Sequence, residues 1–463
     1  MKQLSLATLA LIAGITLFTA CKKKNDATNI SVKQTQIGSL LTGDTLCGHI
    51  KGTMISGKTY VMTCPVTVNF GDTLLMQRGV TVDVRSSSAY FLIQGAFISL
   101  GTKDSANWIT VKSITKQDNV GSANNPTSDP AFTNSGVWLG FQCDTSCQLV
   151  VMKWTHLEFA GGTFGTTPPM TADKAGSNAY PVYITNPNAV FVFEDSWLYG
   201  GIDDGMRPNC NFIIQRSTFE KEGYIGGDCI NPKHGGYGIA AYNMFIGCAT
   251  NGTKASDKGS GSGHVTVTDY FNNTYVNGGY RQQQTGRGGD INYEQGASGQ
   301  SYNNLIVDCK FGFRIVGNPI ADTAHCRYGY NLSYGDADSI VDQFYPVGYY
   351  SYYLPTNIPN PVGTIPATDT LGSTYTAHAW VGANNPLFVN YPLGTAANIN
   401  IDFASGYDFH LQSSSPAIGK GYTGFSANVP PAIKVDPVFG PSSIPVPSKD
   451  LGCYPSDGSG NKH

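Results

Sequence analysis

One short phrase recurs through the middle of the chain, between Val190 and Val316. In each copy a small polar residue leads into an aromatic or aliphatic residue, usually with a glycine a few positions later. The copies are marked by Asp195, Ser217, Asn243, Asn273 and Asn304, at intervals of 22 to 31 residues. An imperfect repeat of this length is typical of a solenoid, whose units bury their apolar side chains only by stacking on one another.

The apolar runs inside the repeat are short and are interrupted by glycine and asparagine. Val190 to Phe193 and Leu305 to Val307 are examples. No stretch keeps the 3.6-residue apolar period of a helix. Each repeat is therefore predicted to be a coil of β-strands in an all-β chain, and variable parts such as Gly247 to Gly263 are predicted to be loops at a coil edge.

The length and composition are compatible with one long solenoid. A chain of 463 residues would suggest two or three globular domains, but a solenoid grows in one dimension and escapes that count. Charged residues make up 13 %, against roughly 25 % in ordinary globular chains. A formal net charge of −3, with no face rich in Lys and Arg, argues against nucleic acid as a partner. We expect a monomer.

The first residues have the features of an export signal. Lys2 precedes an apolar run from Leu4 to Phe18, which is too short for a membrane span and is followed by small residues. Thr19-Ala20-Cys21 resembles a bacterial lipobox, which implies removal of residues 1–20 and lipid on Cys21. Residues 21–39 would then be a lipidated, flexible tether. The alternative is an ordinary signal peptide with an incidental cysteine.

This beginning resembles that of Bacteroidetes-type lipoproteins. The resemblance implies a membrane partner, reached through the lipid on Cys21. It also implies a place in the outer membrane of a Gram-negative bacterium, at the cell surface.

Several phrases of the chain resemble exported bacterial proteins with a right-handed parallel β-helix, the fold of the pectate-lyase-like superfamily. Gly95 to Thr102, Ile109 to Val111 and Leu157 to Gly162 resemble their opening coils, and Asp450 to Tyr454 resembles their closing D-x-G-x-Y element. The resemblance covers about residues 60–450 and implies that fold, with loop excursions and terminal caps. Because the superfamily includes lyases, hydrolases and non-catalytic surface proteins, the resemblance says little about chemistry.

The expected organisation follows from these segments. An N-terminal cap and the main β-helix occupy residues 40–344, and C-terminal coils with a closing segment occupy residues 385–463. Between them, residues 345–384 are rich in tyrosine, proline and threonine and are predicted to be a loop excursion. A small separate subdomain is the competing interpretation.

Ten cysteines remain besides Cys21, an even number that favours disulfides in an exported chain. Of Cys210, Cys229 and Cys248, which fall one coil apart, only two can bond to each other. No CxxC spacing with nearby histidines predicts a zinc site. The natural local pairs are Cys47 with Cys64, Cys143 with Cys147, and Cys309 with Cys326.

Proteins of this shape most often act on polysaccharides, and hydrolysis needs two carboxyl groups that flank the glycosidic bond. The candidates are Asp203, Asp204 and Asp228. Together with His264 and Arg314 they faintly resemble the polygalacturonase motifs N-x-D, D-D, G-H-G and R-I-K. The sequence departs from these motifs, since Gly227 and Val316 replace an aspartate and a lysine. The plainer interpretation makes Asp203 and Asp204 turn residues.

The second reaction is β-elimination of a uronic acid, which needs a basic side chain and a cation that neutralises the carboxylate. Lys233 and His234 are one pair of candidates. The second group of candidates is the loop cluster Arg281, Arg287, Asp290 and Glu294. A solvated loop with a few salt bridges is the competing interpretation of this group. Calcium is the one cofactor considered, because residues 336–342 carry three aspartates, although they lack the glycine and distal glutamate of an EF-hand loop.

Aromatic side chains suggest a non-catalytic role. Trp138, Trp154, Trp197, Tyr275, Tyr280 and Tyr293 could stack on sugars, although aromatics on strands more often form the core or cross-coil stacks. The sequence therefore predicts an exported, lipid-anchored β-helix that engages polysaccharide. The alternatives are a polysaccharide lyase or glycoside hydrolase, and a structural or adhesive surface protein. An enzyme needs its candidates in one groove, and a glycan binder needs a line of exposed aromatics.

Overall fold

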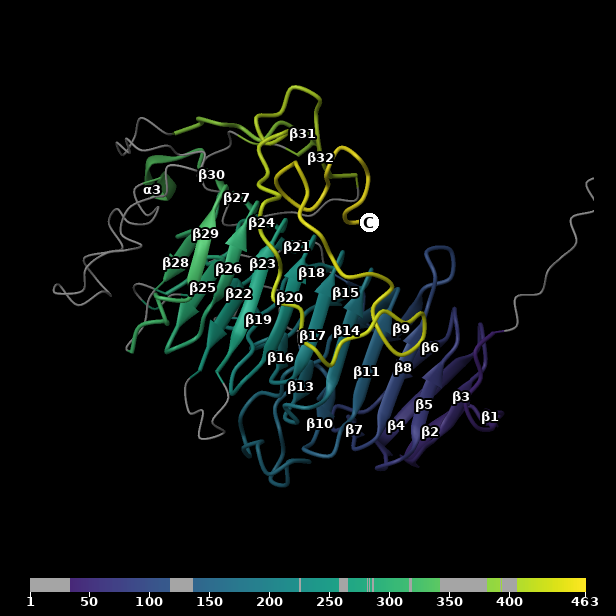
Figure 1. Ribbon diagram of the computed structural model, residues 1–463. Coiled ribbons are helices and arrows are strands. Elements are labelled where there is room, and N and C mark those ends of the chain that lie inside the picture. The colour runs from purple at the N-terminus through teal and green to yellow at the C-terminus, as the bar shows by residue number, and fades with distance from the viewer. Residues whose placement is uncertain are drawn as a thin grey trace, which may run out of the picture. The chain divides into compact units, whose positions relative to one another are not determined.

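Strands of successive coils stack in parallel and form three faces. The computed structural model describes residues 34–116, 136–224, 226–257, 265–280, 282, 284, 287–315, 319–341, 381–391, 393 and 406–463. From Gln36 onward the chain forms one compact unit. Every strand pairing within the coils is parallel (Figure 1), which confirms the predicted parallel β-helix.

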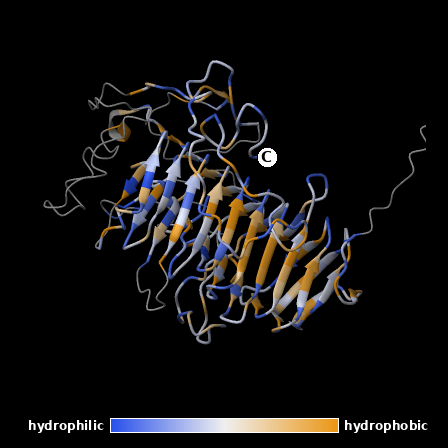
Figure 2. Ribbon diagram, in the orientation of Figure 1, coloured by the Kyte–Doolittle hydropathy of each residue, from blue (hydrophilic) through white to orange (hydrophobic). Residues whose placement is uncertain are grey.

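Face A is a ladder of eleven strands, each paired with the equivalent strand of the next coil. Its strands are β1 (Leu40–Leu41), β3 (Gly52–Met54), β5 (Thr73–Met76), β8 (Ala96–Leu100), β11 (Leu149–Lys153), β14 (Val190–Glu194), β17 (Asn211–Gln215), β20 (Tyr237–Ala241), β23 (Val267–Phe271), β26 (Gly299–Tyr302) and β29 (Cys326–Gly329). Its middle strands are strongly hydrophobic and its last strands are more polar (Figure 2).

Face B follows face A around each coil. Its strands are β2 (Thr45–His49), the first half of β4 (Thr59–Val68), β6 (Thr81–Val84), β9 (Asn107–Thr110), β12 (Thr155–Glu158), β15 (Trp197–Tyr199), β18 (Thr218–Glu220), β21 (Met244–Ile246), β24 (Thr274–Val276), β27 (Leu305–Val307) and β30 (Leu332–Tyr334). A short helix, α3 (Asp338–Val341), comes after β30.

Face C completes the coil. Its strands are the second half of β4, β7 (Phe91–Ile93), β10 (Phe141–Cys143), β13 (Val182–Ile184), β16 (Met206–Pro208), β19 (Asp228–Ile230), β22 (Asn251–Ser256), β25 (Ile291–Glu294) and β28 (Phe313–Ile315). Faces B and C are continuous at the N-terminal end, because β4 pairs with β6 through its first half and with β7 through its second half.

The interior holds a ladder of buried polar side chains where face A turns into face B. The Asn243 amide donates to Oδ1 of Asn273 at 2.9 Å, and the Asn273 amide donates to Oδ1 of Asn304 at 3.0 Å. The same contact links Ser217 to Asn243 and Asn304 to Asn331. These side chains satisfy backbone groups that the turn would otherwise bury without partners.

The ladder explains the repeated phrase and corrects one of its markers. In the first copy the ladder residue is Ser196, whose amide donates to the Ser217 hydroxyl at 3.2 Å. Asp195, taken as the marker, stands one position earlier, where φ is 48°. Arg216, Tyr242, Asn272 and Asn303 occupy the same left-handed position in later coils. The turn therefore places a strained residue before each ladder residue.

Stacked aromatic rings fill much of the remaining interior. Phe219, Phe245 and Tyr275 stack in three successive coils, with ring centroids 4.8 Å apart at each step. Phe91 stacks on Phe141 at 4.6 Å. These spacings match the distance between neighbouring strands, so the rings pack in the same register as the backbone.

The two ends differ from the caps and coils that we expected. Residues 40–61 contain β1, β2, β3 and the start of β4, which already pair in parallel with the strands that follow. After the excursion, which lies almost wholly outside the described residues, β31 (Phe388–Asn390) and β32 (Asp408–Leu411) pair antiparallel, and the described part of this segment contains no parallel coil.

Residues 412–463, which we call the C-terminal strap, contain no helix or strand and run along the outside of the coils (Figure 1). Apolar side chains of the strap, among them Leu451 and Cys453, pack with Met244 and Leu305 of face B. Polar side chains at the corner of faces A and B hold the strap backbone. Lys153 donates to the Asp436 and Pro437 carbonyls, Gln215 to the Ser443 carbonyl, and Asn272 to the Asp450 carbonyl.

Two disulfides form, Cys47–Cys64 and Cys229–Cys248. The second selects one pair from the three cysteines spaced one coil apart. The predicted pairs Cys143–Cys147 and Cys309–Cys326 do not form, and all four residues are buried thiols, as are Cys210 and Cys453. Within the described part of the chain, no helix is long and apolar enough to cross a membrane.

Candidate functional site

A column of polar side chains runs along the side of face C that points away from the core, with one member from each of six successive coils, and most of its members are buried. Parallel pairing sets the neighbours, for example Lys254 beside Asn292 and Asn292 beside Arg314. Neighbouring members of the column therefore lie about one strand spacing, 4.8 Å, from each other, although they are far apart in the sequence. The column consists of Tyr183, Arg207, Asn231, Lys254, Asn292 and Arg314.

A second row, formed by Asp204, Asp228 and Asn251, runs beside this column at the start of the face C strands. The Asp228 amide donates to Oδ1 of Asp204 at 2.9 Å, and the Asn251 amide group donates to Oδ1 of Asp228 at 2.5 Å. Asn231 Nδ2 lies 2.8 Å from Oδ2 of both aspartates. Asn231 thus links the two carboxylates, which belong to neighbouring coils.

Arg207 is paired with Asp204. Its Nη2 lies 2.5 Å from Oδ2 of that carboxylate, and its guanidinium lies over the Tyr180 ring, 3.8 Å from the centroid. Burial alone would raise the pKa of Asp204, but Arg207, Lys233 and the Asp228 amide outweigh it and lower this pKa to about 2. Asp204 is therefore ionised at any ordinary pH.

Lys254 lies between two acidic side chains, those of Asp228 and Glu294. Its Nζ lies 2.9 Å from Oε1 of Glu294 and 3.6 Å from Oδ2 of Asp228. Burial raises the pKa of Asp228, and Lys254 and Asn251 offset this only in part. Arg314 lies further along the column, where its Nη2 is 3.5 Å from Oδ1 of Asn251.

Asp203 differs from Asp204 in its environment. Its side chain is half-buried, and its Oδ1 accepts the Asp204 amide at 2.9 Å. Burial and the neighbouring Asp204 charge raise the pKa of Asp203 to about 6. Two adjacent carboxyl groups thus have pKa values on opposite sides of the ordinary value, the arrangement that separates a proton donor from an ionised group in acid–base sites.

Lys233 lies at the far end of face C, where its backbone amide donates to Oδ1 of Asn209 at 2.8 Å. No residue that the structure describes forms a hydrogen bond or ion pair with its ammonium group, although the side chain is half-buried. Burial and the positive charge of Arg207 lower its pKa. Lys233 is a cation without a paired acid, beside acids that already have partners.

We call Asp203, Asp204, Arg207, Asp228, Asn231, Lys233, Lys254 and Glu294 the face C cluster. It brings together four predicted candidates, Asp203, Asp204, Asp228 and Lys233, and Arg314 joins it through Asn251. Glu294, predicted on a solvated loop, is part of it through Lys254. Arg207, Asn231 and Lys254 were not predicted, because the coil lengths vary and the sequence does not reveal which residues pair across coils.

Other candidates lie elsewhere. Arg287 is exposed on the insertion between faces B and C, and Arg281 lies outside the described residues. His234 follows Lys233 at a left-handed position, with φ 50°. Asp290 is almost completely buried at the corner of faces B and C, where burial raises its pKa to about 8. A buried carboxyl there does not fit the solvated loop that the sequence suggested.

The same corner holds a lysine that was not predicted. The ammonium of Lys310 donates to the Gln282 carbonyl at 2.9 Å, and burial and Arg314 lower its pKa to about 8. Asp336, part of the calcium motif considered, donates its backbone amide to Asp308 at 3.0 Å, and Asp342 lies outside the described residues. In the described ranges, no group of three or more His, Cys, Asp or Glu side chains is placed to hold a metal ion.

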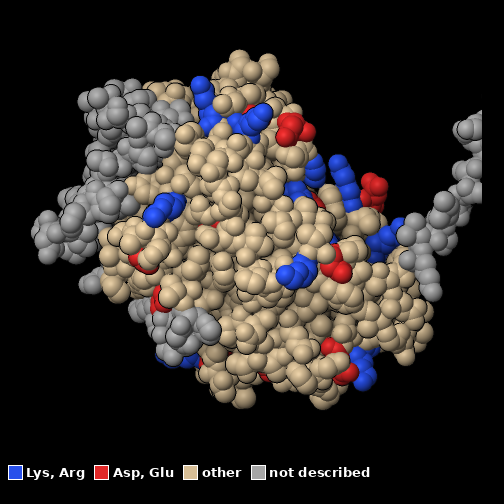
Figure 3. Space-filling view, in the orientation of Figure 1, with Lys and Arg blue, Asp and Glu red and all other residues tan. Residues whose placement is uncertain are grey.

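Five of the six aromatic candidates divide into two groups, and the sixth, Tyr280, is half-buried. Trp138, Tyr275 and Tyr293 are fully buried in the core. Trp154 and Trp197 are half-buried on the outer surface of face B, with ring centroids 6.0 Å apart. On the side of the molecule seen in Figure 3, charged side chains are scattered and form no patch of one sign.

Comparisons with protein-family models, with curated proteins and with solved structures gave no match for this chain. The function must therefore be argued from the face C cluster itself.

Proposed function

We propose that this chain engages polysaccharide and that the face C cluster is the site where it does so. Acids and bases alternate over neighbouring coils in the cluster, and both kinds keep part of their surface open at Asp203, Lys233, Lys254 and Glu294. Such a surface offers acceptors and donors at the spacing of stacked strands. A hydroxyl-rich chain, which needs both, fits it better than a purely anionic ligand does.

The observation that carries the proposal is the state of Lys233. Among the described residues its ammonium has no hydrogen-bond acceptor, and a half-buried charge without a partner is unfavourable. The nearest acids are already held, since Asp204 is paired with Arg207 and Asp228 accepts from Asn231 and Asn251. Oxygens of a ligand would complete the coordination of Lys233, and a uronic acid carboxylate would do so best.

The test is a binding measurement with soluble protein that lacks residues 1–21. Affinity electrophoresis in gels that contain acidic or neutral polysaccharides would compare the unchanged protein with Lys233→Ala. The proposal predicts retardation by at least one polysaccharide, strongest among the acidic ones, and a clearly weaker retardation of Lys233→Ala. Lys434→Ala is the matched control, because Lys434 is an exposed lysine on the C-terminal strap. Equal retardation of both variants would contradict the proposal.

Cleavage of the polysaccharide is a second candidate function, which the divergent pKa values favour. Asp203, with a pKa of about 6, is partly protonated near neutral pH and could donate a proton to a leaving oxygen, while Asp204 stays ionised. Lys233, with its lowered pKa, is the base that elimination would require.

The two reactions leave different products. Elimination creates an unsaturated sugar that absorbs in the ultraviolet, whereas hydrolysis releases reducing ends without that absorbance. A panel of polysaccharides, assayed with and without calcium, would distinguish them. Asp203→Asn should abolish hydrolysis and Lys233→Ala should abolish elimination. Retained binding with neither product would support a binding protein that does not cleave.

The proposal extends to the location of the protein. Cys21, which lies outside the described residues, would carry lipid and hold the chain at the outer membrane, facing the cell surface. Cys21→Ser should move the protein from the membrane fraction to a soluble fraction, and proteinase added to intact cells should degrade the unchanged protein. An unchanged distribution of Cys21→Ser would contradict the anchor.

A further inference from the structure

Four rings stack face to face along the outer surface of face B. The imidazole of His156 lies between Trp108 and Trp197, with ring centroids 3.6 Å and 4.0 Å away and interplanar angles of 1° and 3°. The His463 ring continues the stack on the other side of Trp197, at 3.7 Å. Parallel pairing of β9, β12 and β15 sets these neighbours.

A stack of this kind turns the edges of its rings to solvent, not their faces. The line of aromatic residues is therefore a cross-coil stack, and Trp197 and His156 have no free face for a sugar. Trp108 is different because it ends the stack and is 37 % exposed. Its second face points toward the preceding coil.

The preceding coils carry small residues in that row. Thr81 of β6 pairs with Trp108, and Thr59 of β4 pairs with Thr81. Both threonines are outward-facing, since Tyr60 and Val82 beside them are core residues. The result is a shelf of two hydroxyl-bearing residues, bounded at one end by the open face of an indole ring.

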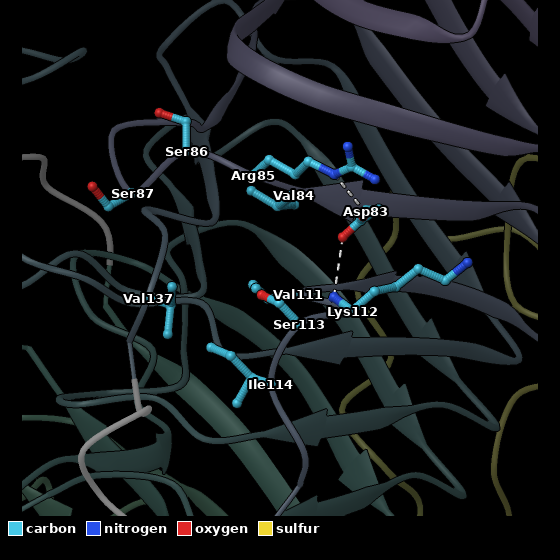
Figure 4. A pocket seen from close by; sticks show the side chains of 10 residues that line it. All are labelled: Asp83, Val84, Arg85, Ser86, Ser87, Val111, Lys112, Ser113, Ile114 and Val137. Atoms are coloured by element: carbon cyan, nitrogen blue, oxygen red, sulfur yellow. Dashed lines mark hydrogen bonds and ion pairs between the residues drawn. The ribbon is translucent and has the colours of Figure 1, made fainter.

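A pocket of about 560 Å³, lined by both polar and apolar side chains, lies further along the same strands (Figure 4). Arg85 Nε donates to Oδ2 of Asp83 at 2.9 Å, and the Lys112 backbone amide donates to the other oxygen of Asp83 at 3.0 Å. The ammonium of Lys112 has no hydrogen bond or ion pair to any residue in the described ranges. The pocket is thus lined by two cations for one acid.

We propose that this surface is a second binding site, for an oligosaccharide that contains uronic acid. One sugar ring stacks on the free face of Trp108 above Thr81, and the carboxylate of a neighbouring sugar binds Lys112 and Arg85. Trp108 and Lys112 are four residues apart, about 13 Å in an extended chain, which two or three sugar units span. The inference rests on the proposed function only for the class of ligand, because no residue of the face C cluster contributes to it.

The charges favour an acidic ligand over a neutral one. Asp83 is occupied by Arg85 and by the Lys112 backbone, so the Lys112 side chain remains to bind an anion. An indole face stacks on the C–H groups of a sugar whether or not the sugar is charged. Trp108 therefore supplies affinity for sugar rings, and Lys112 supplies the preference for an acid.

The test is calorimetric titration of the Lys233→Ala protein, so that the site on face C does not contribute. The probes are trigalacturonate and the neutral cellotriose. We expect trigalacturonate to bind more tightly than cellotriose, and Trp108→Ala to weaken its binding by about tenfold, the loss expected for a stacking contact. Lys112→Ala should reduce the difference between the two probes, because only Arg85 then remains to bind the carboxylate. Phe70→Ala, which truncates an exposed aromatic residue on another part of the surface, is the control and should bind normally.

A second variant guards against an indirect effect of removing Trp108. Thr81→Trp adds a ring to the free end of the stack without removing anything, and it should block binding because it occupies the place of the sugar. Unchanged affinity in Trp108→Ala or in Thr81→Trp would overturn the proposal, as would equal affinity for the two probes in the otherwise unchanged site. The proposed function fails separately, if Lys233→Ala itself has no effect on polysaccharide binding.

Discussion

The backbone amide of Asp228 donates a hydrogen bond of 2.9 Å to Oδ1 of Asp204, one coil earlier. This bond ties a side chain of one coil to the main chain of the next, so the site and the stacking of the coils depend on the same atoms. Asp204 also accepts from Arg207 and Asn231. It is therefore the residue that holds the face C cluster in place, and the half-exposed Asp203 and Lys233 remain to contact a ligand.

Asp204→Asn should destabilise the fold. The change removes the charge that compensates the partly buried Arg207 guanidinium, and breaking such a buried pair costs about 3–5 kcal/mol. Chemical denaturation at pH 7 would measure it. Because the folded-state pKa of Asp204 is lowered to about 2, its contribution is present above the unfolded pKa near 3.8 and is lost as the pH falls toward 2.

Lys51→Ala is the matched control for this prediction. Lys51 also pairs with an aspartate, Asp72, at 3.0 Å, but it is exposed, so its loss should change the free energy of unfolding by less than about 1 kcal/mol. Similar losses in the two variants would show that Asp204 does not hold a buried charge.

Asp290→Asn should stabilise the protein at alkaline pH. Burial raises the folded-state pKa of Asp290 to about 8, so the folded state retains a proton that the unfolded chain releases near pH 3.8. Stability is therefore lost as the pH rises from about 4 to 8, at about 1.4 kcal/mol for each unit of pKa shift. Unfolding free energies of the two proteins at pH 4, 6 and 8 would test this.

The expected difference between Asp290→Asn and the unchanged protein grows with pH and favours the variant by about 2 kcal/mol or more at pH 8. Asp104→Asn, a change at an exposed aspartate, should show no such trend. A difference that stays constant between pH 4 and pH 8 would contradict the buried, protonated carboxyl.

The repeated phrase predicted the fold because its polar residue has the same structural role in every coil. Each ladder residue, such as Asn243 or Asn273, accepts a hydrogen bond from a backbone amide of the preceding coil, which requires a polar side chain at that turn. The phrase therefore recurs wherever the chain passes the corner of faces A and B. The offset at Asp195 arose because the left-handed residue before the ladder is often polar as well.

The site could be predicted only in part. Asp203, Asp204 and Asp228 stand out in the sequence because they cluster near turns, but Arg207 and Lys254 do not. Arg207 lies only three residues from Asp204, but the sequence does not show that the two side chains point to the same side. Lys254 meets Asp228 and Glu294 only through the register of face C, and the insertion before Asp290 obscures the second of these contacts. The sequence also does not show that Asp290 is buried or that the segment after Asn385 runs back along the coils.

Asn273→Ala should destabilise the ladder. The change removes the acceptor of the Asn243 amide and the donor to the Ala240 carbonyl, both of which are buried. Unsatisfied buried groups cost about 1–3 kcal/mol each, and the cavity adds to this. Asn188→Ala, at an exposed position, is the control for denaturation experiments and should have almost no effect. Equal stability of the two variants would mean that the ladder contributes nothing.

The C-terminal strap should contribute to stability through its apolar side chains. Leu451 is fully buried between the strap and face B, so Leu451→Ala should lower the free energy of unfolding by about 2–4 kcal/mol. Val446, on the same strap, is 70 % exposed, and Val446→Ala should change it by less than about 0.5 kcal/mol. If the strap were only loosely attached, both variants would have the same free energy of unfolding as the unchanged protein.

The measurement that tests the central claim most directly is the reductive methylation of lysines with and without polysaccharide, read by mass spectrometry. Lys233 is half-buried, and its ammonium forms no hydrogen bond or ion pair with a described residue, so a polysaccharide on the face C cluster must cover it. We predict that a polysaccharide retarding the protein in gels slows methylation of Lys233 severalfold, while the exposed Lys434 reacts at an unchanged rate. Unchanged methylation of Lys233 with every polysaccharide would contradict the proposed site.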